Sequence, residues 1–136
     1  MFLGYRVGLL AGLLIVPPVA AQTSHGSASD TAHAGLVEAM KHDLRRLVKA
    51  EDAFLARNST YTGVLPQEEF ATRPERRVIV VAQGDKGYSA TLTTTEELGL
   101  TCGLYDGIGV APSPVITSAR KPACWHTLPS GALVAD

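Results

Sequence analysis

Apolar residues recur every three or four positions from Leu36 to about Arg57, and this spacing predicts an amphipathic helix of five to six turns. The apolar stripe consists of Leu36, Met40, Leu44, Leu47, Val48, Phe54 and Leu55. Glu51 is its one polar member. Charged residues occupy most of the opposite side, namely Lys41, Asp43, Arg45, Arg46, Lys49, Asp52 and Arg57. The helix is expected to end at Asn58, because Asn tolerates the left-handed conformation found at helix C-termini.

The second half of the chain carries β-strand patterns separated by turn residues. Residues 76–83 form a β-branched run, and residues 88–94 alternate so that Tyr88, Ala90 and Leu92 share one face. Residues 101–107 and, more briefly, 124–125 are further strand candidates. The pattern predicts an α+β fold in which one long N-terminal helix packs on a three- to four-stranded antiparallel sheet.

The first 21 residues have the three parts of a signal peptide. Arg6 supplies the positive charge, residues 7–16 form an uncharged apolar run, and residues 19–21 are small enough for cleavage before Gln22. The apolar run is shorter than the roughly 20 residues that a membrane-spanning helix needs. We therefore expect an exported protein, periplasmic or extracellular, with an uncleaved membrane anchor as the alternative.

Three further segments follow the leader. Residues 22–34 are small and polar and predict a flexible linker, in which His25 and His33 are expected to be solvated, with loose metal capture as the alternative. Residues 35–128 are expected to form the globular domain, and residues 129–136 a C-terminal tail. Loss of the leader would leave 11 of the 12 basic residues against 13 acidic ones, a net charge of −2. The sequence has no clustered basic patch of the kind that indicates a nucleic-acid partner.

Two cysteines, Cys102 and Cys124, are predicted to form a disulfide, because exported chains ordinarily pair their cysteines. The bond would close a C-terminal loop and stabilise the fold by roughly 3 kcal/mol. A metal site or a reactive thiol is the alternative, but only His126 lies near Cys124 in the sequence. Tyr105 and Trp125, close to the cysteines, are candidate contact residues, with packing against the disulfide as the other interpretation.

A search for catalytic chemistry predicts no active site. The chain has no G-x-S-x-G motif, and neither His42 nor His126 has an evident partner for nucleophilic catalysis. Glu38 and His42 are four residues apart on one helix face, which favours a solvated surface pair over a metal site. We therefore expect no enzyme activity, no cofactor and no metal.

Residues 76–83 have apolar side chains on both faces of the predicted strand. Val78 and Val80 point to one side, and Ile79 and Val81 to the other. One helix can cover only one face of a sheet. We expect the loop of residues 107–122 to cover the second face; the alternative is an exposed face that binds a partner.

The order of these elements resembles the soluble domain of type IV pilins and pseudopilins. The residues that carry the resemblance are DLRRLVKAEDAFLARNSTYTG (43–63), GYSATLT (87–93), CGLYDG (102–107) and KPACW (121–125). Pilins that assemble have an apolar helix with an early glutamate running directly into the amphipathic helix. Here Pro17-Pro18 and the polar linker interrupt that continuity, and the apolar run has no glutamate.

The resemblance therefore implies a pilin-like domain without its polymerisation helix. It would be non-enzymatic and would mediate protein–protein or cell-surface contacts with an unknown partner in the envelope. The alternative function is a small periplasmic ligand-binding or inhibitor domain that uses the disulfide loop.

Overall fold

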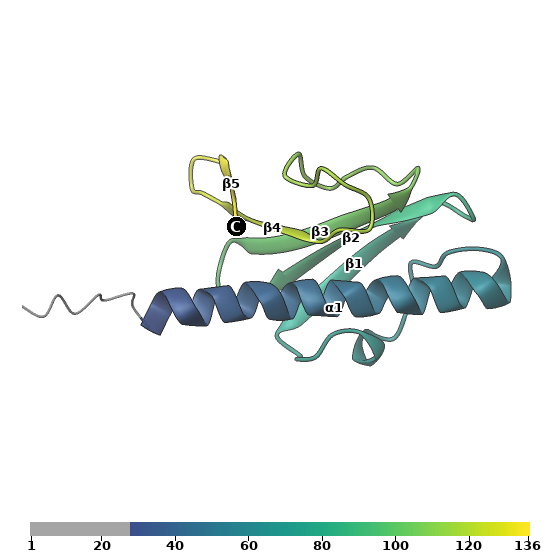
Figure 1. Cartoon of the computed structure of the whole chain (residues 1–136), viewed down its shortest axis with the longest axis horizontal. Helices are drawn as coiled ribbons and strands as arrows, with labels where there is room; N and C mark the ends of the chain where they lie inside the picture. Colours follow the sequence, from purple (N-terminus) through teal and green to yellow (C-terminus); the bar gives the residue numbers. More distant parts are fainter. Residues whose placement is uncertain (1–27) are drawn as a thin grey trace, which may run out of the picture.

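The computed structural model describes residues 28–136, so the expected signal peptide and the first part of the linker lie outside the described residues. The elements are the helix α1 (Ala28–Asn58), the short 3-10 helix η1 (Gln67–Glu69) and the strands β1 (Arg76–Ala82), β2 (Gly87–Thr94), β3 (Leu100–Gly107), β4 (Ala123–Thr127) and β5 (Leu133–Ala135). The helix lies across one face of the sheet (Figure 1). Among the described residues, no helix is both long and apolar enough to cross a membrane.

The sheet is an antiparallel meander in which each strand pairs with the next one in sequence, from β1 to β5. The predicted α+β fold is therefore confirmed, with five strands in place of three or four. The extra strand β5 lies within the expected tail, where Ala135 pairs with Trp125 and Leu133 with Thr127. A turn containing Gly131, at φ +81°, reverses the chain before it. Three residues of exposed strand carry no alternating pattern, so only the pairing with β4 reveals them.

The helix begins at Ala28, inside the segment that was expected to be a linker. Residues 28–34 lack an apolar stripe, which is why their sequence indicates no packed helix. Three of them are alanines, however, and alanine has the highest helix propensity. Asp30 adds a negative charge to the first turn, where the helix dipole favours it. Continuation of the packed helix at Val37 and Met40 removes the need for a new helix nucleus.

The core lies between α1 and the inner face of the sheet. The helix contributes Val37, Met40, Leu44, Leu47 and Val48, and the sheet contributes Val78, Tyr88, Ala90, Leu92, Leu100, Cys102, Leu104 and Cys124. Phe70, which follows η1, closes one side of this core. Most of the predicted stripe is thus buried, and Glu51 is buried with it. Asp43 differs from its predicted place on the polar side, because its carboxylate is fully buried against β1.

The disulfide between Cys102 and Cys124 is present and joins directly opposite residues of β3 and β4. Both cysteines are fully buried beneath the helix. The bond therefore connects neighbouring strands inside the core. It closes the irregular connection between them, because the two cysteines are 22 residues apart in the sequence.

Residues 108–122 pack over the outer face of β3 and β4, on the side away from the helix (Figure 1). A Cβ atom on Gly103 would lie 2.9 Å from Pro112 Cγ and 3.1 Å from Trp125 Cη2, so the loop sits against the sheet with no room for a larger residue. The expected cover is thus found over this half of the sheet. The loop does not extend over β1, where Ile79 and Val81 remain more than half exposed.

Candidate functional site

The two candidate contact residues near the disulfide have different environments. Trp125 is buried between the outer face of the sheet and the loop of residues 108–122. Tyr105 is half-buried, and its carbonyl accepts a hydrogen bond from the Arg120 N–H at 2.7 Å. Trp125 is therefore a buried packing residue, but it packs under the loop on the sheet face opposite the disulfide and not against the disulfide as expected.

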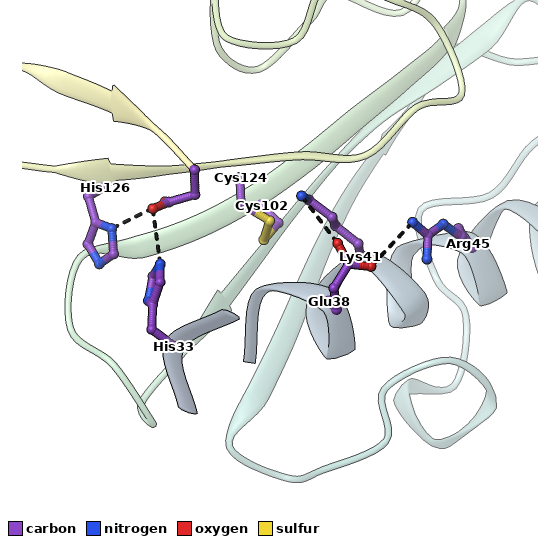
Figure 2. Close-up of a disulfide and its surroundings, with 8 residues drawn as sticks. His33, Glu38, Lys41, Arg45, Cys102, Cys124 and His126 are labelled. Atoms are coloured by element: carbon purple, nitrogen blue, oxygen red, sulfur yellow. Dashed lines mark hydrogen bonds and ion pairs between the residues drawn. A yellow bond between two sulfur atoms is a disulfide. The ribbon is translucent and has the colours of Figure 1, made fainter. Parts of the chain in front are cut away.

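Glu38 and His42 each lie beside other charged groups in the described structure. Glu38 lies 3.5 Å from Lys41 and 3.8 Å from Arg45, both on the same helix (Figure 2). The nearest acidic partner of His42 is Asp43, at 3.9 Å, and the His42 side chain is mostly exposed. The ion pairs of this stretch run along the helix surface, where each contributes only a few tenths of a kcal/mol.

Four residues from distant parts of the chain form a closed cluster at one end of the sheet. His33 Nδ1 lies 2.9 Å from Glu97 Oε2, and His33 Nε2 lies 3.1 Å from Asp136 Oδ1. His126 repeats this arrangement, with Nε2 2.9 Å from Glu97 Oε1 and Nδ1 3.2 Å from Asp136 Oδ2. Figure 2 shows His33 from α1 and His126 from β4 approaching each other at this point.

Each member of this His–carboxylate cluster, defined by these four residues, is positioned by a different element. His33 lies in the second turn of α1, and Glu97 in the turn between β2 and β3. His126 of β4 pairs with Leu100 and Val134, so it stands in the middle of three strands. Asp136 follows β5 and is held by its backbone N–H, which donates to the Cys124 carbonyl at 3.0 Å.

The cluster shifts the proton affinities of His33 and Glu97. The hydrogen bond to Glu97 raises the pKa of His33 above its ordinary value, burial works in the opposite direction, and Asp136 adds to the rise. The pKa of Glu97 is correspondingly lowered, mainly by its hydrogen bond to His33. The side chains are between 15% and 35% exposed, so water reaches the group from one side.

Sequence reasoning missed this cluster. The sequence places His33 in a predicted linker and Asp136 in a predicted tail, and it shows no acidic partner for His126. The residues are separated by as many as 103 positions, so no local spacing connects them. Only the folding of α1 against the C-terminal hairpin brings them together.

A second polar cluster connects the helix with the C-terminal end of β3 through the loop of residues 108–122. Arg120 donates to Asp52 of α1 at 2.6 Å and also to Asp106 of β3. These two carboxylates raise the pKa of Arg120. The bonds tie the loop that covers the outer face to the helix on the inner face, which gives the cluster an evident structural role.

Three surface hollows bear on ligand binding. A hollow of about 630 Å³ is lined by η1, the following loop and the first residues of β1, including Gln67, Thr72 and Arg77. Two others, of about 250 and 430 Å³, lie along β1 and beside the start of α1. None of the three is lined by residues 108–122, so none lies at the disulfide loop that the ligand-binding alternative requires.

Comparison with known proteins finds no matching family model, no matching curated protein and no matching solved structure. The resemblance to pilins therefore has only the residues and the order of elements behind it.

Proposed function

We propose that this chain is an exported pilin-like domain that acts by contacting another protein of the cell envelope, without catalysis. The observation that carries the proposal is the outer face of β1. Ile79 is 59% exposed and Val81 56% exposed, side by side along one strand. Adjoining apolar side chains on an accessible sheet face form a candidate surface for a partner to cover.

The contact is proposed through the face of β1 and not through its free edge. The Gln67 side chain accepts a hydrogen bond from the Val78 N–H at 3.1 Å and donates to the Val78 carbonyl at 3.2 Å. Gln67 thus occupies the place that an added strand would take at this residue. Such protection of an edge strand disfavours β-strand addition, while Ile79 and Val81 on the face stay accessible.

Opposite residues of β2 extend the same face with small polar side chains. Thr91 pairs with Ile79, and Ser89 pairs with Val81. Neither is charged, so a partner could bury them without the high cost of desolvating an ion. The partner that fits is a protein presenting an apolar surface of its own to Ile79 and Val81, and exposed Arg77 flanks that contact on the same face.

The resemblance to pilins supports an envelope location for this contact. The supporting features are the long helix followed directly by an antiparallel meander, with a disulfide that joins β3 and β4. Export would also supply the oxidising compartment in which such a disulfide forms.

The experiment is site-specific photo-crosslinking in the native host. A photoreactive residue at position 79 is expected to capture one defined envelope protein, and the same residue in place of exposed Lys49 on α1 is the matched control. Val81→Lys, introduced together with the probe at position 79, should abolish the product. A product that is equally strong at both positions, or that survives Val81→Lys, contradicts the proposed surface.

Export is tested separately by intact mass and fractionation of the native protein. The proposal expects a chain that starts at Gln22, two hydrogens lighter than the reduced form, in a soluble fraction outside the cytoplasm. A full-length chain in the membrane fraction would instead indicate an anchored protein and would reopen assembly into a filament.

A further inference from the structure

We propose that His33, His126 and Asp136 bind a divalent transition-metal ion, best matched by Zn²⁺, and that Glu97 orients both imidazoles for it. This site goes beyond the proposed protein contact. It lies where the start of α1 meets the C-terminal strands, at the other edge of the sheet from β1.

The first support is the closeness of the potential ligand atoms. One donor atom from each of His33, His126 and Asp136 lies within 4.8 Å of the other two. Zn²⁺ bound at about 2.0–2.1 Å in tetrahedral geometry holds its ligands roughly 3.3 Å apart. The Asp136 oxygens are already 3.1 Å from His33 Nε2 and 3.2 Å from His126 Nδ1. Small side-chain movements would therefore suffice to admit the ion.

The second support is the position of Glu97. Its two oxygens contact the other nitrogen of each ring, His33 Nδ1 and His126 Nε2, both at 2.9 Å. A histidine that binds metal ordinarily donates its second ring N–H to a carboxylate or carbonyl, which fixes the tautomer and the ring orientation. Glu97 can accept one such bond from each ring, leaving His33 Nε2 and His126 Nδ1 directed toward Asp136.

The chemistry of the donors favours Zn²⁺ over harder ions. Ca²⁺ and Mg²⁺ prefer six or more oxygen ligands, whereas imidazole nitrogens suit Zn²⁺ and its neighbours in the transition series. Two imidazoles and one carboxylate also leave one tetrahedral position open. Because the cluster is partly exposed, a water molecule can fill that position.

A bound ion would link the two ends of the described chain to each other. His33 belongs to the first turns of α1, which otherwise make few buried contacts, and Asp136 follows β5, whose three residues are exposed. An ion bound only by the folded form stabilises it by mass action. Metal should therefore order the helix start and the β4–β5 hairpin together.

The test is a Zn²⁺ titration of the purified protein, made without a polyhistidine tag and stripped of metal with EDTA. Competition with a chromophoric chelator is expected to show one ion per chain, and X-ray absorption two imidazole ligands. At a free Zn²⁺ concentration 100 times the dissociation constant, Tm should rise by at least about 5 °C.

Variants decide whether this site is responsible. His33→Ala and His126→Ala should each weaken Zn²⁺ binding by more than 100-fold and remove the rise in Tm. The matched controls are His42→Ala, on the same helix, and His25→Ala, and both should bind like the unsubstituted protein. Far-ultraviolet circular dichroism verifies folding; if His126→Ala does not fold, His33→Ala alone carries the comparison, since its side chain is partly exposed.

Glu97→Gln tests the positioning role. It should lower the affinity by roughly 10- to 100-fold while leaving one ion per chain, as expected for a group that holds ligands without touching the metal. The proposal is overturned if the stripped protein binds no Zn²⁺, or if His42→Ala or His25→Ala costs as much affinity as His33→Ala. The cluster would then be a network of hydrogen bonds only. None of these outcomes affects the crosslinking result at position 79.

Discussion

Asp43 of α1 and Arg76 of β1 form an ion pair inside the protein. Arg76 Nη1 donates to Asp43 Oδ2 at 3.1 Å, and the two side chains are only 4% and 0% exposed. The same Asp43 oxygen accepts a hydrogen bond from the Thr72 hydroxyl, while Arg76 Nη2 reaches Glu96 at 3.2 Å. The pair thus fixes the helix, the loop before β1 and the turn after β2 relative to one another.

We predict that Arg76→Met destabilises the domain by about 3–5 kcal/mol, because it leaves the Asp43 carboxylate buried without its counter-charge. The double variant Asp43→Leu/Arg76→Met should regain most of this loss, since two apolar residues need no compensation. Urea unfolding measures both free energies.

The matched control for this prediction is Arg77→Met, one residue further along β1 and exposed. It should change the free energy of unfolding by less than about 0.5 kcal/mol. Equal losses for Arg76→Met and Arg77→Met would show that the buried pair does not contribute to stability as the structure implies.

Removal of the disulfide is predicted to cost about 3 kcal/mol, the loop-closure value for a bond of this separation. Cys102→Ala/Cys124→Ala should therefore melt well below the parent. Both cysteines are fully buried, so we also expect reductant to act slowly on the folded protein and quickly in urea. Calorimetry and thiol labelling report the two effects; rapid labelling of the native protein would contradict the buried position.

Glu51 predicts a pH dependence of stability. Burial raises the pKa of this carboxyl, the hydrogen bond from the Thr62 N–H opposes the rise, and Asp52 adds to it. The stability that Glu51 contributes by being protonated is therefore fully present below the pKa it has in the unfolded chain, near 4.5. This stability is lost as the pH rises through the higher pKa that Glu51 has in the folded protein. Glu51→Gln, which cannot ionise, should be more stable than the parent at neutral pH.

The measurement is the urea midpoint of both proteins between pH 4 and pH 8. The advantage of Glu51→Gln should shrink toward zero as the pH falls to about 4, because the parent carboxyl is then protonated as well. Glu68→Gln, at an exposed position of η1, is the control and should show no such trend. A constant difference across the range would mean that ionisation of Glu51 is not the cause.

Leu47→Asp is predicted to unfold the domain or to cost about 4 kcal/mol or more, because it places a charge on the buried stripe of α1. Leu47 is fully buried in the core. Lys49→Asp, two residues later on the exposed side, should leave circular dichroism and Tm nearly unchanged. If both variants melt alike, the side of α1 that faces the sheet has been assigned incorrectly.

The sequence by itself determined the elements whose pattern is local. Helical spacing identified the middle of α1, alternation identified β2, and the presence of only two cysteines allowed one pairing. These signals are strong because each buried residue leaves a mark within a few positions of its neighbours.

Only the tertiary structure decided where the long-range polar contacts form. Asp43 looks like a surface residue until β1 supplies Arg76, and His33 looks like part of a linker until Glu97 and Asp136 surround it. The strand β5 likewise exists because β4 offers free hydrogen-bonding groups to it. Such partners lie tens of residues away in the sequence, and their meeting depends on how the helix packs on the sheet, which no local periodicity encodes.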